Sequence, residues 1–176
     1  MILKGFKEKS NKKYLNKMLS KRKVYVDDSK VGSLGVIINI DELDDFELFR
    51  DLATHLNVRP NKLKVIAFSP SKTEKPNFWE LCFNQKDIGW SGAIKNIELQ
   101  AFLDKPFDVL ISYYTSSEIE LKLLTGLSKA KFKIGILQTD PRLNDLIIKT
   151  NLDEFKVFKN EVFKYLTILN KIKDEQ

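Results

Sequence analysis

One stretch of the sequence, residues 107–137, constrains the fold more than any other. It opens with a short apolar run at 109–111, which is typical of a strand buried on both faces. Apolar residues then recur at helical spacing over 119–130, and strand alternation resumes over 132–136. A strand, a helix and a strand within about thirty residues form a βαβ unit, whose two strands are parallel. This stretch therefore predicts a parallel sheet covered by helices.

The same pattern occurs earlier in the chain. Residues 34–40 and 63–68 predict two strands, and the helix between them is expected to begin after Asp41 and to cover 43–57. An amphipathic helix over 155–172 closes the chain. Together these elements predict an α/β fold, a three-layer sandwich with a mostly parallel sheet that is Rossmann-like or flavodoxin-like.

Helix starts carry recognisable caps. Asn96 can cap a short helix that stops before Pro106. For the helix of the central unit, two capping boxes fit the sequence, Thr115 with Glu118 and Ser117 with Glu120.

The remaining segments set the expected domain organisation. Residues 24–176 are expected to form a single α/β domain, with an irregular excursion at 70–97 that contains a Gly-Trp-Ser-Gly turn at 89–92. Shorter strands are predicted at 24–26, 78–83 and 143–148. Residues 1–23 form a separate basic helical arm, with a break near Gly5 and a helix over 11–21.

Charge is distributed unevenly between arm and body. The net charge is +6, but residues 1–23 alone carry +8, so the rest of the chain carries −2. Phosphate groups of RNA or of an anionic membrane suit such an arm. The nine basic residues are Lys4, Lys7, Lys9, Lys12, Lys13, Lys17, Lys21, Arg22 and Lys23. The alternative is a helix that packs on the body and leaves its lysines in solvent.

Several classes of protein are disfavoured by composition. No apolar run approaches 18 residues, so we expect no transmembrane segment, and the start of the chain lacks the features of a signal peptide. The single cysteine, Cys82, excludes an internal disulfide and fits a reducing compartment. We therefore expect cytoplasmic residence.

Ligands of open α/β sheets bind beyond the carboxyl ends of the strands. Polar residues follow several predicted strands at that edge and define a possible ligand pocket. These residues are Asn39, Asp41, Tyr113, Thr115 and Gln138.

No cluster of residues forces a particular chemistry. Asp41, Glu42, Asp44 and Asp45 could hold Mg²⁺, but the favoured explanation is that they stabilise a helix N-terminus through its dipole. One histidine, His55, and one cysteine, Cys82, are too few for a zinc site. Phosphate-binding glycine loops are absent. We therefore expect no catalytic residue, no metal and no cofactor.

The sequence resembles a family of short uncharacterised proteins of flavobacteria and other Bacteroidota. The matching features are the basic start, the KDIGWSG turn at 86–92, and the segments FDVLISYY, SKAKFKIGI and DLII. This resemblance implies residence in the cytoplasm of such a bacterium and no established activity.

Residues 107–136 are also similar to the acceptor half of heptosyltransferase-like glycosyltransferases. The match consists of a D-x-x-I strand at 108–111 and a K/R-x-G strand at 133–135. Those enzymes carry the sugar nucleotide in a second domain. The similarity therefore implies an α/β fold. It also leaves a degenerate glycosyltransferase-like domain as one hypothesis.

The leading hypothesis from the sequence is a non-enzymatic α/β domain whose basic arm docks on RNA, the ribosome or another anionic surface, such as an acidic protein. A second hypothesis is attachment to a membrane or membrane protein through Leu15, Met18 and Leu19. A third is a small-molecule site at the carboxyl edge of the sheet.

Overall fold

A six-stranded sheet forms the centre of the computed structural model, which describes residues 1–24, 27–70, 81–137 and 140–174. Each neighbouring pair of strands is parallel, and the order β3-β2-β1-β4-β5-β6 is that of a Rossmann-like fold. The strands are β1 (Leu34–Asn39), β2 (Leu63–Ser69), β3 (Cys82–Asn84), β4 (Val109–Tyr113), β5 (Phe132–Ile136) and β6 (Leu146–Ile148). The predicted α/β fold with a parallel sheet is confirmed.

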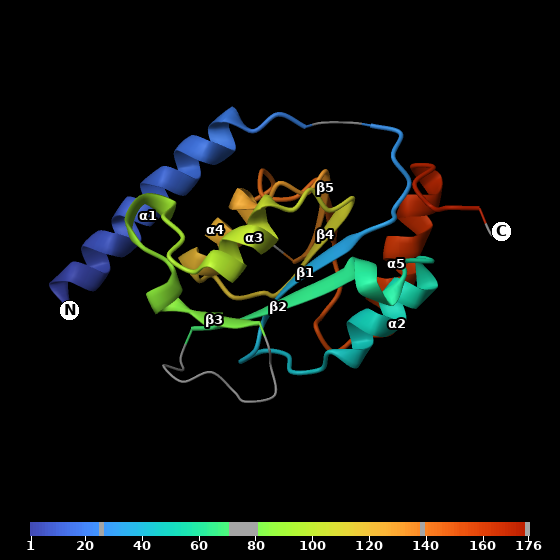
Figure 1. The fold of residues 1–176 in the computed structure, drawn as a ribbon, viewed down its shortest axis with the longest axis horizontal. Helices are drawn as coiled ribbons and strands as arrows, with labels where there is room; N and C mark the ends of the chain where they lie inside the picture. Colours follow the sequence, from blue (N-terminus) through green and yellow to red (C-terminus); the bar gives the residue numbers. More distant parts are fainter. Residues whose placement is uncertain (25–26, 71–80, 138–139, 175–176) are drawn as a thin grey trace.

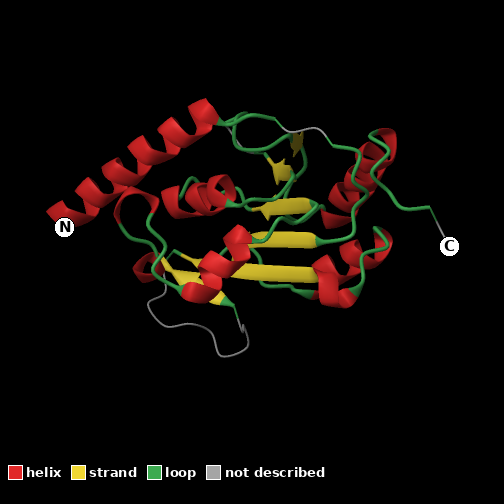
Figure 2. Cartoon of the chain, turned by 45° about the horizontal axis from the view of Figure 1, so that its top comes forward, coloured by secondary structure: helices red, strands yellow, loops and turns green. Residues whose placement is uncertain are grey.

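Helices cover both faces of this sheet (Figures 1 and 2). On one face, α2 (Glu47–His55) and α5 (Phe155–Ile168) pack over a core that includes Val36 and Ile38 of β1. On the other face, α3 (Ile97–Asp104) and α4 (Ile119–Leu127) pack over a core that includes Ile37. Because both faces are buried, the central strands read as continuous apolar runs.

The basic arm is one continuous helix, α1 (Ile2–Lys21), which lies against the outer side of α4. The predicted break at Gly5 is wrong, because that residue stands inside the helix, and a Cβ at its position would meet nothing within 4 Å. Leu15 and Leu19 of α1 are buried in the same core as Leu123 of α4. The arm therefore forms an additional layer on the body.

Two helices begin differently from the prediction. α2 starts at Glu47 instead of after Asp41, because the Asn39 side chain accepts the Asp41 amide at 3.0 Å and forms a turn. At the start of α4, Thr115 bonds Glu42 and forms no capping box, and Ser116 Oγ accepts the Glu118 amide at 3.2 Å. The predicted cap of α3 is confirmed, since Asn96 Oδ1 accepts two amides of its first turn.

The peripheral strands are shorter than predicted. β3 and β6 each contain three residues. Val24 lies outside any strand and is exposed, whereas residues 25–26 and 71–80 lie outside the described residues. Residues 85–92 instead form two short 3₁₀ turns, Gln85–Asp87 and Trp90–Gly92.

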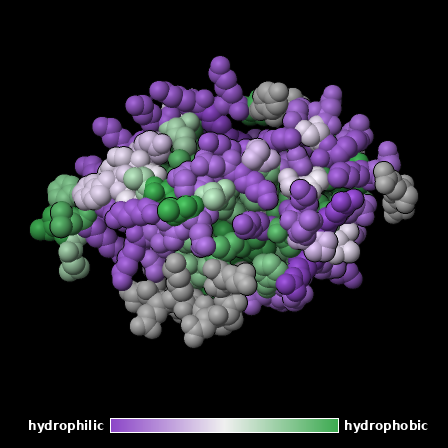
Figure 3. Space-filling view, in the orientation of Figure 1, coloured by the Kyte–Doolittle hydropathy of each residue, from purple (hydrophilic) through white to green (hydrophobic). Residues whose placement is uncertain are grey.

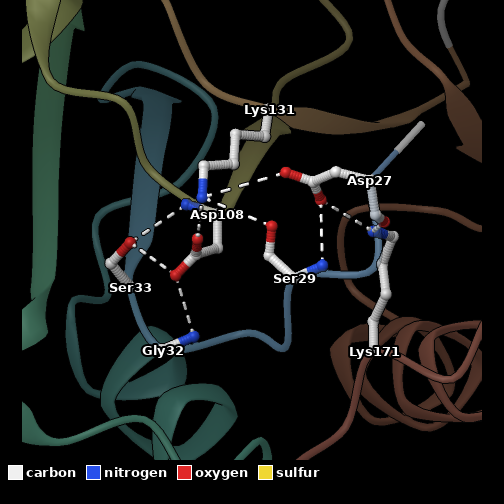
Figure 4. Close-up of polar contacts among 7 residues, drawn as sticks. All are labelled: Asp27, Ser29, Gly32, Ser33, Asp108, Lys131 and Lys171. Carbon is white, nitrogen blue, oxygen red and sulfur yellow. Dashed lines mark hydrogen bonds and ion pairs between the residues drawn. The ribbon is translucent and has the colours of Figure 1, made fainter. Parts of the chain in front are cut away.

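Asp108 joins the segments that lead into β1, β4 and β5 at the amino edge of the sheet (Figure 4). Ligands of such folds bind at the opposite edge. Its carboxylate accepts the Gly32 amide and the Ser33 hydroxyl, both at 3.0 Å, and pairs with the Lys131 ammonium at 2.9 Å. Burial acts to raise the Asp108 pKa, but these donors outweigh it and hold the pKa below its usual range. The D-x-x-I strand thus has a structural explanation.

Candidate docking surface

The inner face of α1 is fixed to the turn at 89–92 by a buried asparagine. Asn11 is fully buried, its Nδ2 donates to the carbonyl of Gly89 at 3.1 Å, and its Oδ1 accepts the amide of Gly92 at 3.0 Å. Beside it, the hydroxyls of Ser10 and Ser91 are 3.0 Å apart. These contacts place the helix in one register on the body.

Two glycines permit this close approach. A Cβ on Gly92, whose φ is +70°, would lie 2.5 Å from the ring of Tyr14. A Cβ on Gly126 of α4 would lie 2.7 Å from Met18. Side chains of α1 therefore occupy the space that a larger residue would need.

Charged groups anchor both ends of the helix. Arg22 pairs with Asp145 at 2.6 Å, and Asp145 also accepts the amide of Lys133. Lys7 Nζ donates to the carbonyl of Gln85 at 2.9 Å, and burial lowers the pKa of this ammonium. Two of the nine predicted partner-binding cations therefore hold α1 on the body.

Away from the body, α1 and the residues just after it present a cationic surface to solvent. Six of the predicted residues are exposed and make no hydrogen bond or ion pair through their side chains within the described part of the chain. We call these six residues the lysine ridge. They are Lys9, Lys12, Lys13, Lys17, Lys21 and Lys23.

Like charges on this ridge oppose the helix that carries them. Lys9, Lys13 and Lys17 follow one another at spacings of four residues, and each such like-charged pair costs a few tenths of a kcal/mol. The first turn of α1 holds no acidic residue that would offset them. Packing of Leu15 and Leu19, at about 1.5 to 3 kcal/mol each, outweighs this repulsion.

A cleft of about 700 Å³ separates the first turns of α1 from the body. Lys4, the remaining predicted cation, lines it together with Leu3, Trp90 and Glu120. Burial raises the pKa of the Glu120 carboxyl. Carboxylates and ammonium groups thus share the walls of this cleft, whereas the ridge is purely cationic.

Some residues of the predicted ligand pocket at the carboxyl edge make contacts within the protein. Asn39 and Tyr113 end the neighbouring strands β1 and β4, but the Tyr113 hydroxyl donates to the Leu152 carbonyl at 2.8 Å. Burial raises the pKa of Tyr113. Its ring meets Phe49 edge-on at 5.6 Å.

The segments that follow β1 and β4 are joined by a further pair of residues. Thr115 donates both its amide and its hydroxyl to the carboxylate of Glu42, at 3.0 and 2.5 Å. Asp41 is exposed, and Gln138 lies outside the described residues. The structure therefore brings Asn39 and Tyr113 together and joins Thr115 to Glu42, one of the acidic residues considered for Mg²⁺.

Other candidate chemistry is dispersed. His55 packs on Phe163 at 4.6 Å, while Cys82 is buried in strand β3. In the described ranges, no three His, Cys, Asp or Glu side chains gather as a metal-binding group. None of the described helices combines the length and apolar composition needed to cross a membrane.

The contacts that fix this surface on the body were not predicted from the sequence. Asn11 and Tyr14 meet Gly92 only because segments about 80 residues apart fold together, so local periodicity gives no signal for these contacts. The apolar residues Ile2 and Phe6 among the first lysines were visible in the sequence as a pattern.

Residues 7–169 match the model of a protein family described as "Family of unknown function (DUF6913)". The match covers most of α1 and nearly all of the α/β body. No curated protein and no solved structure shows significant similarity to the chain.

Proposed function

Because the chain belongs to this family of unknown function, we propose a role from the geometry of α1: the protein is a non-enzymatic docking domain that attaches to a phosphate-bearing macromolecular surface. The lysine ridge makes the contact, and this contact positions the α/β body on that surface. We include residence in the cytoplasm of a bacterium of the Bacteroidota in this proposal. Phosphates of RNA, including ribosomal RNA, and of anionic lipids offer the same chemistry to the ridge.

One observation carries the proposal. Within the described residues, the ridge lysines are exposed and make no side-chain hydrogen bond or ion pair, and they lie on or just after a helix whose inner face is clamped by Asn11, Leu15 and Arg22. A clamped helix presents its cations without the loss of backbone freedom that a flexible arm suffers on binding. Their mutual repulsion is relieved when they meet an anionic surface.

The Leu15, Met18 and Leu19 stripe supports the packing role instead of a membrane role. Leu15 and Leu19 are buried, and Met18 lies against Gly126. Any partner must therefore meet the outer face of α1. Deletion of residues 1–23 would also expose the core beneath, so substitutions on the ridge are the sharper test.

The test compares two triple variants of equal charge. Lys9, Lys13 and Lys17 are changed to Gln in the ridge variant; Lys64, Lys149 and Lys156, which are exposed on the body, are changed in the control. Co-sedimentation with ribosomal RNA and with anionic vesicles is measured at low and physiological salt. For RNA, each lost phosphate contact should lower the slope of log affinity against log salt by about 0.7 to 0.9. Equal binding by both variants would contradict the proposal.

A further inference from the structure

The first turns of α1 expose large apolar side chains next to the lysine ridge. Ile2, Leu3 and Phe6 are 78%, 74% and 57% exposed. We call these three residues the apolar tip. In Figure 3 hydrophobic side chains gather at the left end of the molecule, where Figure 1 places the N-terminal end of α1. RNA binding or a purely structural role leaves this exposure unexplained.

Two residues of the apolar tip and three of the lysine ridge lie on one line along the helix. Ile2, Phe6, Lys9, Lys13 and Lys17 follow at spacings of four, three, four and four residues, so they share the outer face of α1 over about 22 Å. A surface that meets this face would contact apolar groups at one end and ammonium groups along the rest.

An aromatic residue from the body lies at the same end. Trp90 is 49% exposed and lines the same cleft as Leu3 and Lys4. Tryptophan rings favour the boundary between lipid headgroups and acyl chains. Trp90 begins the 3₁₀ turn that Asn11 of α1 holds through Gly92. The Trp90 ring and the apolar tip therefore have a fixed position relative to each other.

Charge selects among the surfaces that could cover the apolar tip. A second copy of the chain would bring its own Lys4, Lys7 and Lys9 against the same cations, which opposes pairing. Nucleic-acid backbones neutralise lysines but give Ile2 and Leu3 no apolar environment. An anionic bilayer offers both the phosphates and the hydrocarbon.

We propose that α1 attaches the protein to an anionic lipid surface. The apolar tip inserts between the lipids, Trp90 lies at headgroup level, and the lysine ridge binds lipid phosphates. This inference rests on the proposed function and names its partner. The helix binds in the interface and does not span the bilayer.

Flotation with vesicles of phosphatidylcholine and phosphatidylglycerol tests the proposal on the full chain. In the tip variant Leu3 and Phe6 are changed to Ser, which should lower binding by about tenfold for each residue. In the control, Ile97 and Ile168, exposed by 86% and 68% on α3 and α5, are changed to Ser and binding should stay as in the wild type. Each ridge lysine changed to Gln should lower binding by about fivefold.

A spectroscopic readout reports insertion directly. In a Trp79→Phe background, Trp90 is the remaining tryptophan, and its emission should shift to the blue with anionic vesicles and stay unchanged with vesicles of phosphatidylcholine alone. Wild-type flotation by the tip variant would overturn the inference. Binding of the wild type to ribosomal RNA but not to vesicles would also overturn it. Self-association through the apolar tip, with no binding to RNA or vesicles, would do the same.

Failure of the proposed function has a different signature. If the wild type binds neither ribosomal RNA nor anionic vesicles, the docking role itself is wrong. If the ridge variant loses binding while the tip variant keeps it, docking stands and insertion of the tip is excluded.

Discussion

The side-chain oxygen of Asn11 accepts the amide hydrogen of Gly92 at 3.0 Å, between residues 81 positions apart in the chain. The same side chain donates to the carbonyl of Gly89. One buried amide thus satisfies two backbone groups of the turn and fixes α1 on the body. The basic arm is therefore a rigid part of the structure, and its lysines form a surface of defined geometry.

Replacing Asn11 by Ala should loosen this attachment. The Gly89 carbonyl and the Gly92 amide would then be buried without a hydrogen-bond partner. The free energy of unfolding should therefore fall by about 2 to 4 kcal/mol. Urea denaturation gives this value, and hydrogen exchange should show faster exchange in α1. Lys13→Ala, on the exposed face of the same helix, is the control. Equal stability of the two variants would show that the Asn11 contacts do not hold the helix.

Replacing Gly92 by Ala should destabilise the protein for two separable reasons. A φ of +70° disfavours a residue with a Cβ by about 1 to 2 kcal/mol, and that Cβ would also overlap the ring of Tyr14. In a Tyr14→Ala background the overlap disappears and the backbone term stays. A double-mutant cycle should therefore give a coupling energy of about 1 kcal/mol. A coupling energy of zero would mean that the ring does not fill this space.

Asp108 should make the free energy of unfolding depend on pH in the acidic range. Its pKa is held low in the folded protein, mainly by Lys131, Gly32 and Ser33 against the effect of burial. The stabilisation is present above the ordinary aspartate pKa and is lost as the pH falls through the lower pKa of the folded state. Asp108→Asn should lower the free energy of unfolding by about 2 to 3 kcal/mol at neutral pH.

The difference between Asp108→Asn and the wild type should shrink as the pH falls below about 4. Urea denaturation at several pH values measures it. Asp28→Asn, at an exposed position, is the control. A difference that stays constant with pH would assign the loss to packing instead of charge.

Lys133 should make the free energy of unfolding depend on pH in the alkaline range. Burial lowers the pKa of its ammonium to about 8, although it donates to the Thr125 and Gly126 carbonyls at the end of α4 at 2.7 and 3.2 Å. The unfolded chain binds this proton up to a pKa near 10.4, so stability should rise between about pH 8 and 10. In Lys133→Met this part of the rise should be absent. A parallel pH profile of wild type and variant would contradict the lowered pKa.

Patterns within short stretches predicted most of the sheet and its helices. Apolar runs marked β1, β2 and β4, because a parallel sheet buried on both faces needs them. The Asn96 cap was legible because the donors lie two and three residues away. The start of α2 was predicted too early, since the Asn39 side chain competes with a helix for the Asp41 amide.

The candidate surface was predicted only in part. Its lysines were evident as a charge run, but their division into anchors and ridge depends on contacts with residues far away in the chain, such as Asp145 and Gln85. The bridge between Glu42 and Thr115 joins residues 73 positions apart and carries no local signal either. Contacts of this kind follow from the packing of helices on a completed sheet.

The lysine reactivity of the bound protein tests the central claim most directly. Full-length protein is acetylated briefly with and without anionic vesicles, and modification is read at each lysine by mass spectrometry. Docking through α1 predicts that Lys9, Lys13 and Lys17 become several-fold slower to react, while Lys64 and Lys156 on the body keep their rates. Protection spread evenly over all five lysines, or confined to the body, would contradict docking through the outer face of α1.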